Sequence, residues 1–277
     1  MTEQVLKIGI STCPNDTYTF SGLLEQCIGD VPAMSFVLED IQALNDHALA
    51  GEYDLAKVSF HAALKLADAY RVLPVGAALG YGVGPLMLAA NEQLATRSPQ
   101  AGDRVLCPGQ WTTATLLYKL LVPKGPEPQQ VVFSDIMPAL INGEADYGVV
   151  IHEGRFTYQQ QGLAMAMDLG NLWETQMAQP LPLGGLIIRR SLGDAMAKRI
   201  VDAVRRSMDH AKTHPQLATK VMKQYAQEFT DEVLWEHVKL YVNQTTYDLG
   251  QVGQQALEKL SFEARKVGLI DEDVSLF

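Results

Sequence analysis

Residues 147–158 read YGVVIHEGRFTY, and this stretch decides the fold prediction. Residues 148–151 form a short apolar, β-branched run, which is typical of a strand buried on both faces in a parallel sheet. The run leads directly into His152, Glu153 and Arg155. In open α/β sheets, ligands bind outside the carboxyl ends of the strands. A lone histidine is more often structural, but one at a strand end can exchange a proton near neutral pH, so we predict an α/β fold with a functional site at His152.

The composition is that of a globular protein that acts on a small molecule. The 277 residues suffice for one large or two modest domains. The net charge is −10 and no run of Lys or Arg exceeds a pair, which argues against binding to nucleic acid. No signal peptide is visible and no apolar run approaches the ~20 residues of a membrane span, so no stable membrane association is expected.

Three cysteines, at positions 13, 27 and 107, indicate the cellular compartment. An odd number in a chain without a visible signal peptide predicts free thiols, and therefore a cytoplasmic protein. Their spacing fits no zinc motif.

Apolar runs and helical patterns alternate along the rest of the chain. Strands are predicted at residues 5–10, 35–38, 53–58, 72–78, 104–106, 130–133, 147–151 and 181–190. Helices are predicted at about residues 15–24, 41–50, 60–69, 114–121, 134–142, 194–213, 215–225, 231–241 and 250–267.

The two halves of this pattern resemble each other. Cys13-Pro14 matches Cys107-Pro108, Asp40-Ile41 matches Asp135-Ile136, and Gly51-Glu52-x-Asp54 matches Gly143-Glu144-x-Asp146. Three matches in the same order, about 94 residues apart, predict two similarly built lobes.

We place lobe 1 at residues 1–90 and 173–277, including the C-terminal helices, and lobe 2 at residues 91–172. A chain that crosses twice between two α/β lobes predicts a two-lobed periplasmic-binding-protein-like (type II) fold, with the active site in the cleft between the lobes.

Polar residues cluster where the first strand leads into a helix. They are Ser11, Thr12, Asn15, Asp16 and Thr17. N–H groups at a helix start favour a carboxylate or a hydroxyl-rich ligand, although capping explains one or two of these residues. Asp16 would repel an anion, so it is expected to fix the turn or to bind a hydroxyl. Thr112 and Thr113 occupy the matching place in lobe 2.

Lys57 lies in an apolar strand, where a lysine needs a partner. An anionic ligand or a carboxylate of the other lobe would be that partner. His61 is expected to open a helix, and the patterns around His210, His214 and His237 indicate an exposed surface. No GxSxG motif and no dinucleotide-binding motif are present, so the residues favour proton abstraction from a small anionic metabolite without cofactor or metal.

Several of these motifs together resemble the menaquinone-biosynthesis MqnD family, the 1,4-dihydroxy-6-naphthoate synthases of the futalosine pathway. The motifs are ISTCPNDT at 10–17, KVS at 57–59, GAALG at 76–80, Thr112-Thr113, IHEGRFTY at 151–158, PLGG at 182–185 and DLG at 248–250. They are distributed over nearly the whole chain.

The resemblance implies a cofactor-independent carbon–carbon lyase that converts cyclic dehypoxanthine futalosine to 1,4-dihydroxy-6-naphthoate. It implies His152 as the proton acceptor, with substrate contacts at Lys57, Val58, Ser59, Thr112 and Thr113. Glu153 or Arg155 would orient the imidazole or cap the cleft.

Two alternatives remain open at this point. Chorismate dehydratase of the same pathway shares the fold, but the IHEGRFTY motif argues against it. A non-catalytic solute-binding protein also shares the fold, but the lack of a visible signal peptide and the histidine at the cleft argue against it. The sequence leaves the oligomeric state open.

Overall fold

The structure is a computed structural model that describes residues 5–151, 154–226, 230–270 and 275–277. The chain divides into two compact units. The first unit comprises Met1–Gly80, Gly184–Gln254 and Asp273–Phe277, and the second comprises Tyr81–Leu183 and Gln255–Glu272. These bounds differ from the predicted ones, because the chain enters the second unit at residue 81 and most of the last long helix belongs to it. No helix in the described ranges is long and apolar enough to span a membrane.

A mixed sheet forms the centre of the first unit. Its order is β2 (Met34–Glu39), β1 (Leu6–Ser11), β3 (Leu55–Ser59), β11 (Leu181–Arg189) and β4 (Tyr70–Val72), with β5 (Ala78–Gly80) paired to β11. Strands β1, β2 and β3 are parallel, whereas β11 runs antiparallel to β3 and β4. The predicted continuous strand at 72–78 is wrong: Pro74 and Gly76, which has a φ of +75°, separate β4 from β5.

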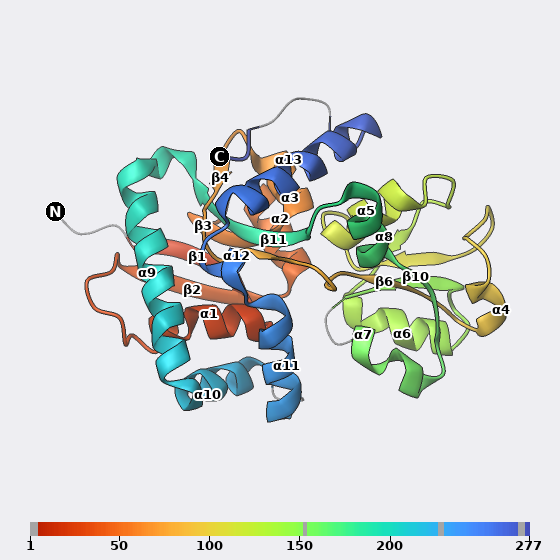
Figure 1. The fold of residues 1–277 in the computed structure, drawn as a ribbon, viewed down its shortest axis with the longest axis horizontal. Helices are drawn as coiled ribbons and strands as arrows, with labels where there is room; N and C mark the ends of the chain where they lie inside the picture. The colour runs from red at the N-terminus through yellow and green to blue at the C-terminus, as the bar shows by residue number, and fades with distance from the viewer. Residues whose placement is uncertain (1–4, 152–153, 227–229, 271–274) are drawn as a thin grey trace. The chain divides into compact units, whose positions relative to one another are not determined.

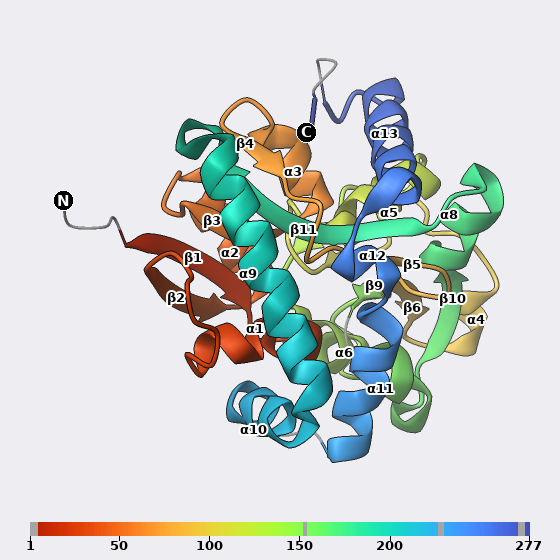
Figure 2. The same cartoon turned by 60° about the vertical axis from the view of Figure 1, so that its left-hand side comes forward.

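Helices cover this sheet. They are α1 (Pro14–Leu24), α2 (Ile41–Leu49), α3 (Phe60–Leu66), α9 (Gly193–Thr213), α10 (Pro215–Tyr225), α11 (Asp231–Tyr241) and α12 (Gln244–Tyr247). Helices α9, α10 and α11 pack around α1 (Figures 1 and 2). Helix α9 is amphipathic, and its buried side chains at Ile200, Val204 and Met208 recur at helical spacing and pack in the same core as Ile8 and Ile10 of β1.

The second unit contains its own mixed sheet. The order is β10 (Ala164–Asp168), β6 (Leu86–Ala89), β9 (Tyr147–Val150), β7 (Val105–Cys107) and β8 (Gln129–Gln130). All four residues of the central strand β9 are buried, as predicted. Strand β6 was not predicted, and it pairs antiparallel with both β9 and β10. The predicted strand at 130–133 is too long and displaced: β8 covers only Gln129–Gln130, and Phe133 already begins a helix.

The helices and helical turns that complete the chain are α4 (Glu92–Ala95), α5 (Thr113–Leu121), α6 (Phe133–Ile141), α7 (Gly154–Thr157), α8 (Leu169–Met177), α13 (Gly250–Lys266) and the 3₁₀ turns η1 (Tyr158–Gln161) and η2 (Arg190–Leu192). Helix α6 packs directly on β9. A Cβ atom at Gly148 would lie 2.4 Å from Ile136, so this close packing requires the glycine in the strand.

The two units share one local arrangement of hydrogen bonds, at the aspartates of the matched Gly-Glu-x-Asp sequences. In the first unit, the N–H of Lys7 donates to Asp54 Oδ2 (2.9 Å) and the N–H of Asp54 donates to the Lys7 carbonyl (2.9 Å). In the second unit, Arg104 and Asp146 make the same pair of bonds at 2.7 and 2.9 Å. A helix-ending glycine with positive φ precedes each aspartate.

Candidate functional site

The turn between β1 and α1 brings the predicted polar residues of the first unit together. Pro14 is the first residue of α1, where its missing N–H costs nothing, and the preceding Cys13 makes no side-chain cap. Asp16 therefore lies in the first turn of the helix, where the helix dipole favours its charge. The Ser11 hydroxyl donates to Asp16 Oδ2 at 2.6 Å, so the residue that ends the strand holds the carboxylate.

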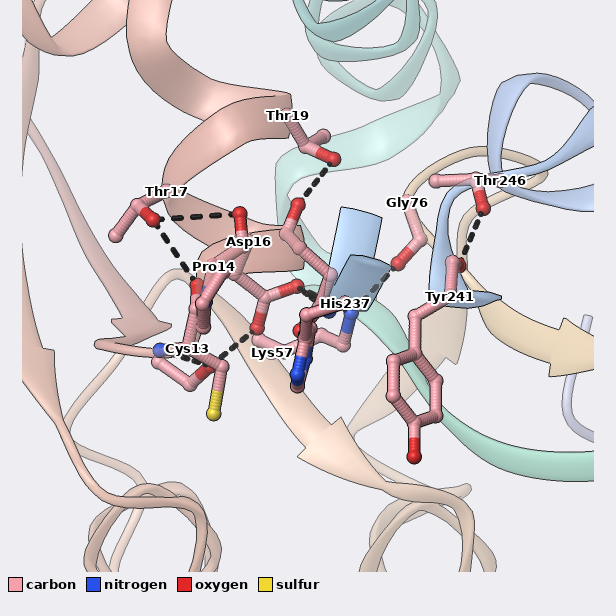
Figure 3. Close-up of polar contacts among 12 residues, drawn as sticks. Cys13, Pro14, Asp16, Thr17, Thr19, Lys57, Gly76, His237, Tyr241 and Thr246 are labelled. Carbon is pink, nitrogen blue, oxygen red and sulfur yellow. Dashed lines mark hydrogen bonds and ion pairs between the residues drawn. The ribbon is translucent and has the colours of Figure 1, made fainter. Parts of the chain in front are cut away.

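Lys57 of β3 forms a buried ion pair with Asp16 (Figure 3). Lys57 Nζ lies 2.6 Å from Asp16 Oδ1 and 2.9 Å from the Gly76 carbonyl, and both charged side chains are less than a tenth exposed. A buried charge pair is tolerated only when further hydrogen bonds satisfy it, and Ser11 and Gly76 supply them. Lys57 was expected to contact an anionic ligand or a carboxylate of the other lobe, whereas the carboxylate that it pairs with, Asp16, belongs to its own unit.

Asn15 and His237 extend this pair into a chain of hydrogen bonds. Asn15 Nδ2 donates to Asp16 Oδ1 (2.9 Å), and His237 Nε2 lies 3.0 Å from Asn15 Oδ1. An ionised carboxylate only accepts, so the Asn15 amide must face it with its NH₂ group, and its oxygen is left to His237. His237 therefore carries its hydrogen on Nε2 and donates it.

His237 is the residue that the sequence interpretation misjudged. It is 6% exposed rather than on the surface, and its ring lies 4.5 Å from that of Tyr241. Leu234, Val238 and Tyr241 form the buried face of α11, and His237 lies on that face. Helical spacing from these apolar neighbours is the sequence signal that indicates its burial.

The chain of hydrogen bonds continues beyond Lys57. The N–H of Gly76 donates to the Thr246 carbonyl (2.7 Å), so the backbone that accepts from Lys57 is held in turn by α12. Figure 3 shows His237, Asp16, Lys57, Gly76 and Thr246 side by side. All of them belong to the first unit, and their mutual bonds fix the cluster without any ligand.

Ser59, the last residue of β3, makes two hydrogen bonds with the side chain of Asn45 in α2. Its N–H donates to Asn45 Oδ1 (2.9 Å) and its Oγ accepts from Asn45 Nδ2 (3.1 Å). The neighbouring Val58 is fully buried and pairs with Gly185 of β11. Thr12 is half-buried, and its N–H donates to the Glu39 carbonyl at 3.3 Å.

Thr112 and Thr113 lie at the start of α5 in the second unit. Thr112 is the N-cap: its hydroxyl donates to the Gly109 carbonyl (2.8 Å) and accepts from the N–H of Thr115 (3.2 Å). The Thr113 hydroxyl donates to the Leu183 carbonyl at 2.6 Å. Both side chains are buried, and two backbone carbonyls accept their hydroxyl hydrogens: that of Gly109 in the turn and that of Leu183 in β11.

The motif after β9 is described only in part, because His152 and Glu153 lie outside the described residues. Arg155 of α7 donates to the Gly84 carbonyl (2.6 Å), and its guanidinium lies 3.9 Å from Asp168. Gly84 has a φ of +121°, and a Cβ atom there would lie 2.9 Å from the Gly170 backbone, so only glycine fits. Arg155 thus attaches the start of α7 to this loop.

The thiols and acids of the described residues add two constraints. All three cysteines are free, as predicted, and burial raises the pKa of the Cys107 thiol to about 12, so this thiol is neutral near pH 7. Burial also raises the pKa of Glu174, whose carboxylate accepts from the N–H of Gly82 (2.8 Å). Within the described part of the chain, no three His, Cys, Asp or Glu residues are grouped so that they could hold a metal ion.

Known proteins resemble this chain over nearly its full length. A family described as menaquinone biosynthesis matches residues 6–266. The 1,4-dihydroxy-6-naphtoate synthase of Thermus thermophilus is 41% identical over 266 residues, which cover 96% of each chain. The protein of the same name from Streptomyces coelicolor is 39% identical over 275 residues, covering 98% of this chain and 96% of the other.

Solved structures agree with the fold. Protein AF1704 from Archaeoglobus fulgidus superposes with a TM-score of 0.90 at 33% identity, covering 98% of this chain and all of the other. The periplasmic aliphatic sulphonate binding protein SsuA from Escherichia coli gives a TM-score of 0.65 at 12% identity, over 100% of this chain and 91% of the other. The periplasmic-binding-protein-like fold is thereby confirmed. The sequence matches show in addition that the chain belongs to the menaquinone-biosynthesis family.

Proposed function

We propose that this protein is a lyase of menaquinone biosynthesis that converts cyclic dehypoxanthine futalosine to 1,4-dihydroxy-6-naphthoate. The observation that carries the proposal is the near-full-length identity of about two residues in five to two proteins named for this product. The IHEGRFTY motif supports the same activity. We assign the reaction to the cytoplasm, in line with the three free thiols, and propose that it needs neither cofactor nor metal.

The first unit supplies polar contacts for the substrate in this proposal. The Lys57 ammonium has three N–H bonds, and Asp16 and Gly76 accept two of them. We assign the third, together with the Ser59 hydroxyl, to substrate oxygens. Ser11 and Asn15 act indirectly, because both donate to Asp16 and hold the carboxylate that orients Lys57.

The second unit supplies helix N-terminal contacts. The Thr112 side chain already takes the N–H of Thr115, so the N–H groups of Thr113 and Ala114 are left for an anionic group of the substrate. Because the hydroxyl of Thr113 donates to a backbone carbonyl, it offers a ligand only its oxygen lone pairs. A substrate hydroxyl is the group that would donate to it.

His152 is the general base in this scheme. It removes a proton from the sugar-derived part of the substrate, a carbon–carbon bond breaks, and the new naphthoate ring becomes aromatic, which drives the step. The central position of β9, which ends just before His152, supports this role. The Arg155 guanidinium already donates to the Gly84 carbonyl, so we assign to Arg155 the role of attaching α7 to the Gly84 loop. We assign the orientation of the imidazole to Glu153.

An anaerobic turnover assay tests the proposal. The purified protein, treated with a chelator, is incubated with cyclic dehypoxanthine futalosine, and the naphthoate product is measured by mass spectrometry. We expect product, and we expect His152→Ala to bind substrate without turning it over. Near-wild-type turnover by His152→Ala would exclude this histidine as the base. If the wild type binds the substrate without forming product, a solute-binding protein is supported instead. If, in a parallel incubation, it consumes chorismate, the dehydratase is supported.

A further inference from the structure

The side-chain amide of Asn45 in α2 is buried, and within the described residues both of its hydrogen bonds go to Ser59. Its side chain is fully buried, its Oδ1 accepts the Ser59 N–H at 2.9 Å, and its Nδ2 donates to Ser59 Oγ at 3.1 Å. A backbone N–H can only donate, so it determines which end of the amide faces it. The NH₂ end must therefore face the Ser59 hydroxyl oxygen, and in this contact the hydroxyl is an acceptor.

A second observation shows that Asn45 diverts Ser59 from the usual role of a serine at this place. Ser59 is the N-cap of α3, yet its side chain makes no capping hydrogen bond. By contrast, the N-cap Asp40 accepts from the N–H groups of Gln42 and Ala43, and Thr112 accepts from Thr115. With Nδ2 of Asn45 on its oxygen, the Ser59 hydroxyl keeps its hydrogen for a different acceptor.

We propose that Asn45 is a positioning residue that fixes the Ser59 hydroxyl as a hydrogen-bond donor. Ser59 then selects an acceptor group of the substrate, a carboxylate or carbonyl oxygen, and disfavours a donor at the same place. This inference rests on the proposed function, in which Ser59 contacts the substrate. Asn45 itself contacts Ser59 and not the ligand.

The substitution Asn45→Asp reverses the polarity of the contact with little change of shape. One carboxylate oxygen still accepts the Ser59 N–H, but the other now attracts the Ser59 hydroxyl hydrogen. The hydroxyl then turns its lone pairs toward the substrate. Loss of a hydrogen bond to a charged group is expected to lower kcat/KM and the affinity for the product roughly 10- to 100-fold. The affinity is measured by calorimetry with 1,4-dihydroxy-6-naphthoate.

A double-mutant cycle separates this role from a merely structural one. Ser59→Ala removes the donor and is expected to cause a loss similar to that of Asn45→Asp. The double variant is expected to lose no more than either single variant, because Asn45 acts through Ser59. Ala48→Ser, on the same buried face of α2, is the matched control: it should lower the melting temperature and leave kcat/KM unchanged.

The outcomes are distinguishable from those of the proposed function. If the wild type shows no turnover, the proposed function fails, and the product affinities of the same variants still decide the role of Asn45. If turnover is normal and the losses of the two single variants multiply, or Asn45→Asp equals the wild type, the positioning role is excluded. If Asn45→Asp does not fold, Ser59→Ala alone decides the question. Full product affinity and turnover in that variant would exclude the Ser59 hydroxyl as a donor to the substrate.

Discussion

A Cys-Pro pair lies at the end of β1 and again at the end of β7, but the two turns stabilise their helices differently. In the first unit, α1 starts at Pro14, its N-cap Cys13 makes no side-chain cap, and the first turn carries the buried Asp16. In the second unit, α5 starts only at Thr113, and Thr112 caps it with its own hydroxyl. The first turn therefore depends on a charge from a neighbouring strand, whereas the second uses neutral hydroxyls that donate to backbone carbonyls.

The strands beside these turns differ in the same sense. When Gly51 is matched with Gly143, Lys57 corresponds to Val149, which is fully buried in β9. The ion pair thus has no counterpart in the second unit at the matched position. A common architecture therefore carries a charged polar cluster in one unit and neutral hydroxyls in the other, and substitutions in the two turns should have unequal consequences.

The largest effect is expected when the ion pair is broken. Lys57→Met leaves the Asp16 carboxylate buried beside an apolar side chain, and we expect a loss of roughly 3–5 kcal/mol in the free energy of unfolding. Denaturant unfolding measures it. Combining it with Asp16→Asn removes the unpaired charge and should restore part of the loss. A cost below about 1 kcal/mol for Lys57→Met would show that the pair behaves like a surface contact.

The next effect concerns the end of the same polar chain. His237→Phe keeps a ring against Tyr241 but removes the donor to Asn15, so a loss of about 1–3 kcal/mol in unfolding free energy is expected. His237→Gln is the matched variant, because its side-chain amide can place an N–H near the position of Nε2. Equal stability of the two variants would mean that only the packing of His237 matters.

Parts of this site were predictable from the sequence, for physical reasons. Parallel neighbouring strands end at one edge of a sheet, so the ends of β1 and β3 had to bring Ser11, Asp16 and Lys57 close together. The particular partner of Lys57 was not predictable, because it depends on strand register and on where α1 begins. His237 lies 222 residues from Asn15 in the sequence, and local patterns carry no information about such a contact.

The fold was predictable to a similar degree. The apolar, β-branched run at 148–151 predicts the buried strand β9, which covers Tyr147–Val150. Strand β6 was missed although all its residues are buried, because Pro85 precedes it and, unlike β9, it contains no β-branched residue. The first predicted boundary, at residue 90, differs from the division of the structure for the same reason, since β6 places residues 86–89 in the second unit.

A smaller effect is expected in the second turn. Thr112→Val removes the cap of α5 and the donor to the Gly109 carbonyl, and we expect a loss of about 1 kcal/mol in unfolding free energy. Thr112→Ser keeps the hydroxyl and should remain close to the wild type. The comparison between the units would break if Thr112→Val cost as much as Lys57→Met, because the second turn would then depend on its side chain as strongly as the first.

The smallest effects are two pH dependences of opposite sign. In the first unit, a hydrogen bond from His47 Nδ1 to the Glu39 carboxylate raises the pKa of His47, and the charge of Glu39 adds to it. A raised pKa stabilises the fold fully below the unfolded value of about 6.5, and this contribution disappears as the pH rises through the folded pKa. His47 is well exposed, so the difference in unfolding free energy between the wild type and His47→Asn should stay below about 1 kcal/mol and should shrink above neutral pH.

In the second unit, the hydrogen bonds from Arg97 lower the pKa of Asp103, and the N–H of Gln100 adds to this effect. A lowered pKa contributes stability above the unfolded value of about 3.9, and the contribution is lost as the pH falls through the folded pKa. The difference between the wild type and Asp103→Asn should therefore shrink in acid, where that of His47→Asn is at its largest. Chemical denaturation between pH 3 and 9, roughly the range spanned by these two groups, measures both. Parallel pH curves for the two variants would contradict the opposite signs, and would mean that one of the two ion pairs is not formed in solution.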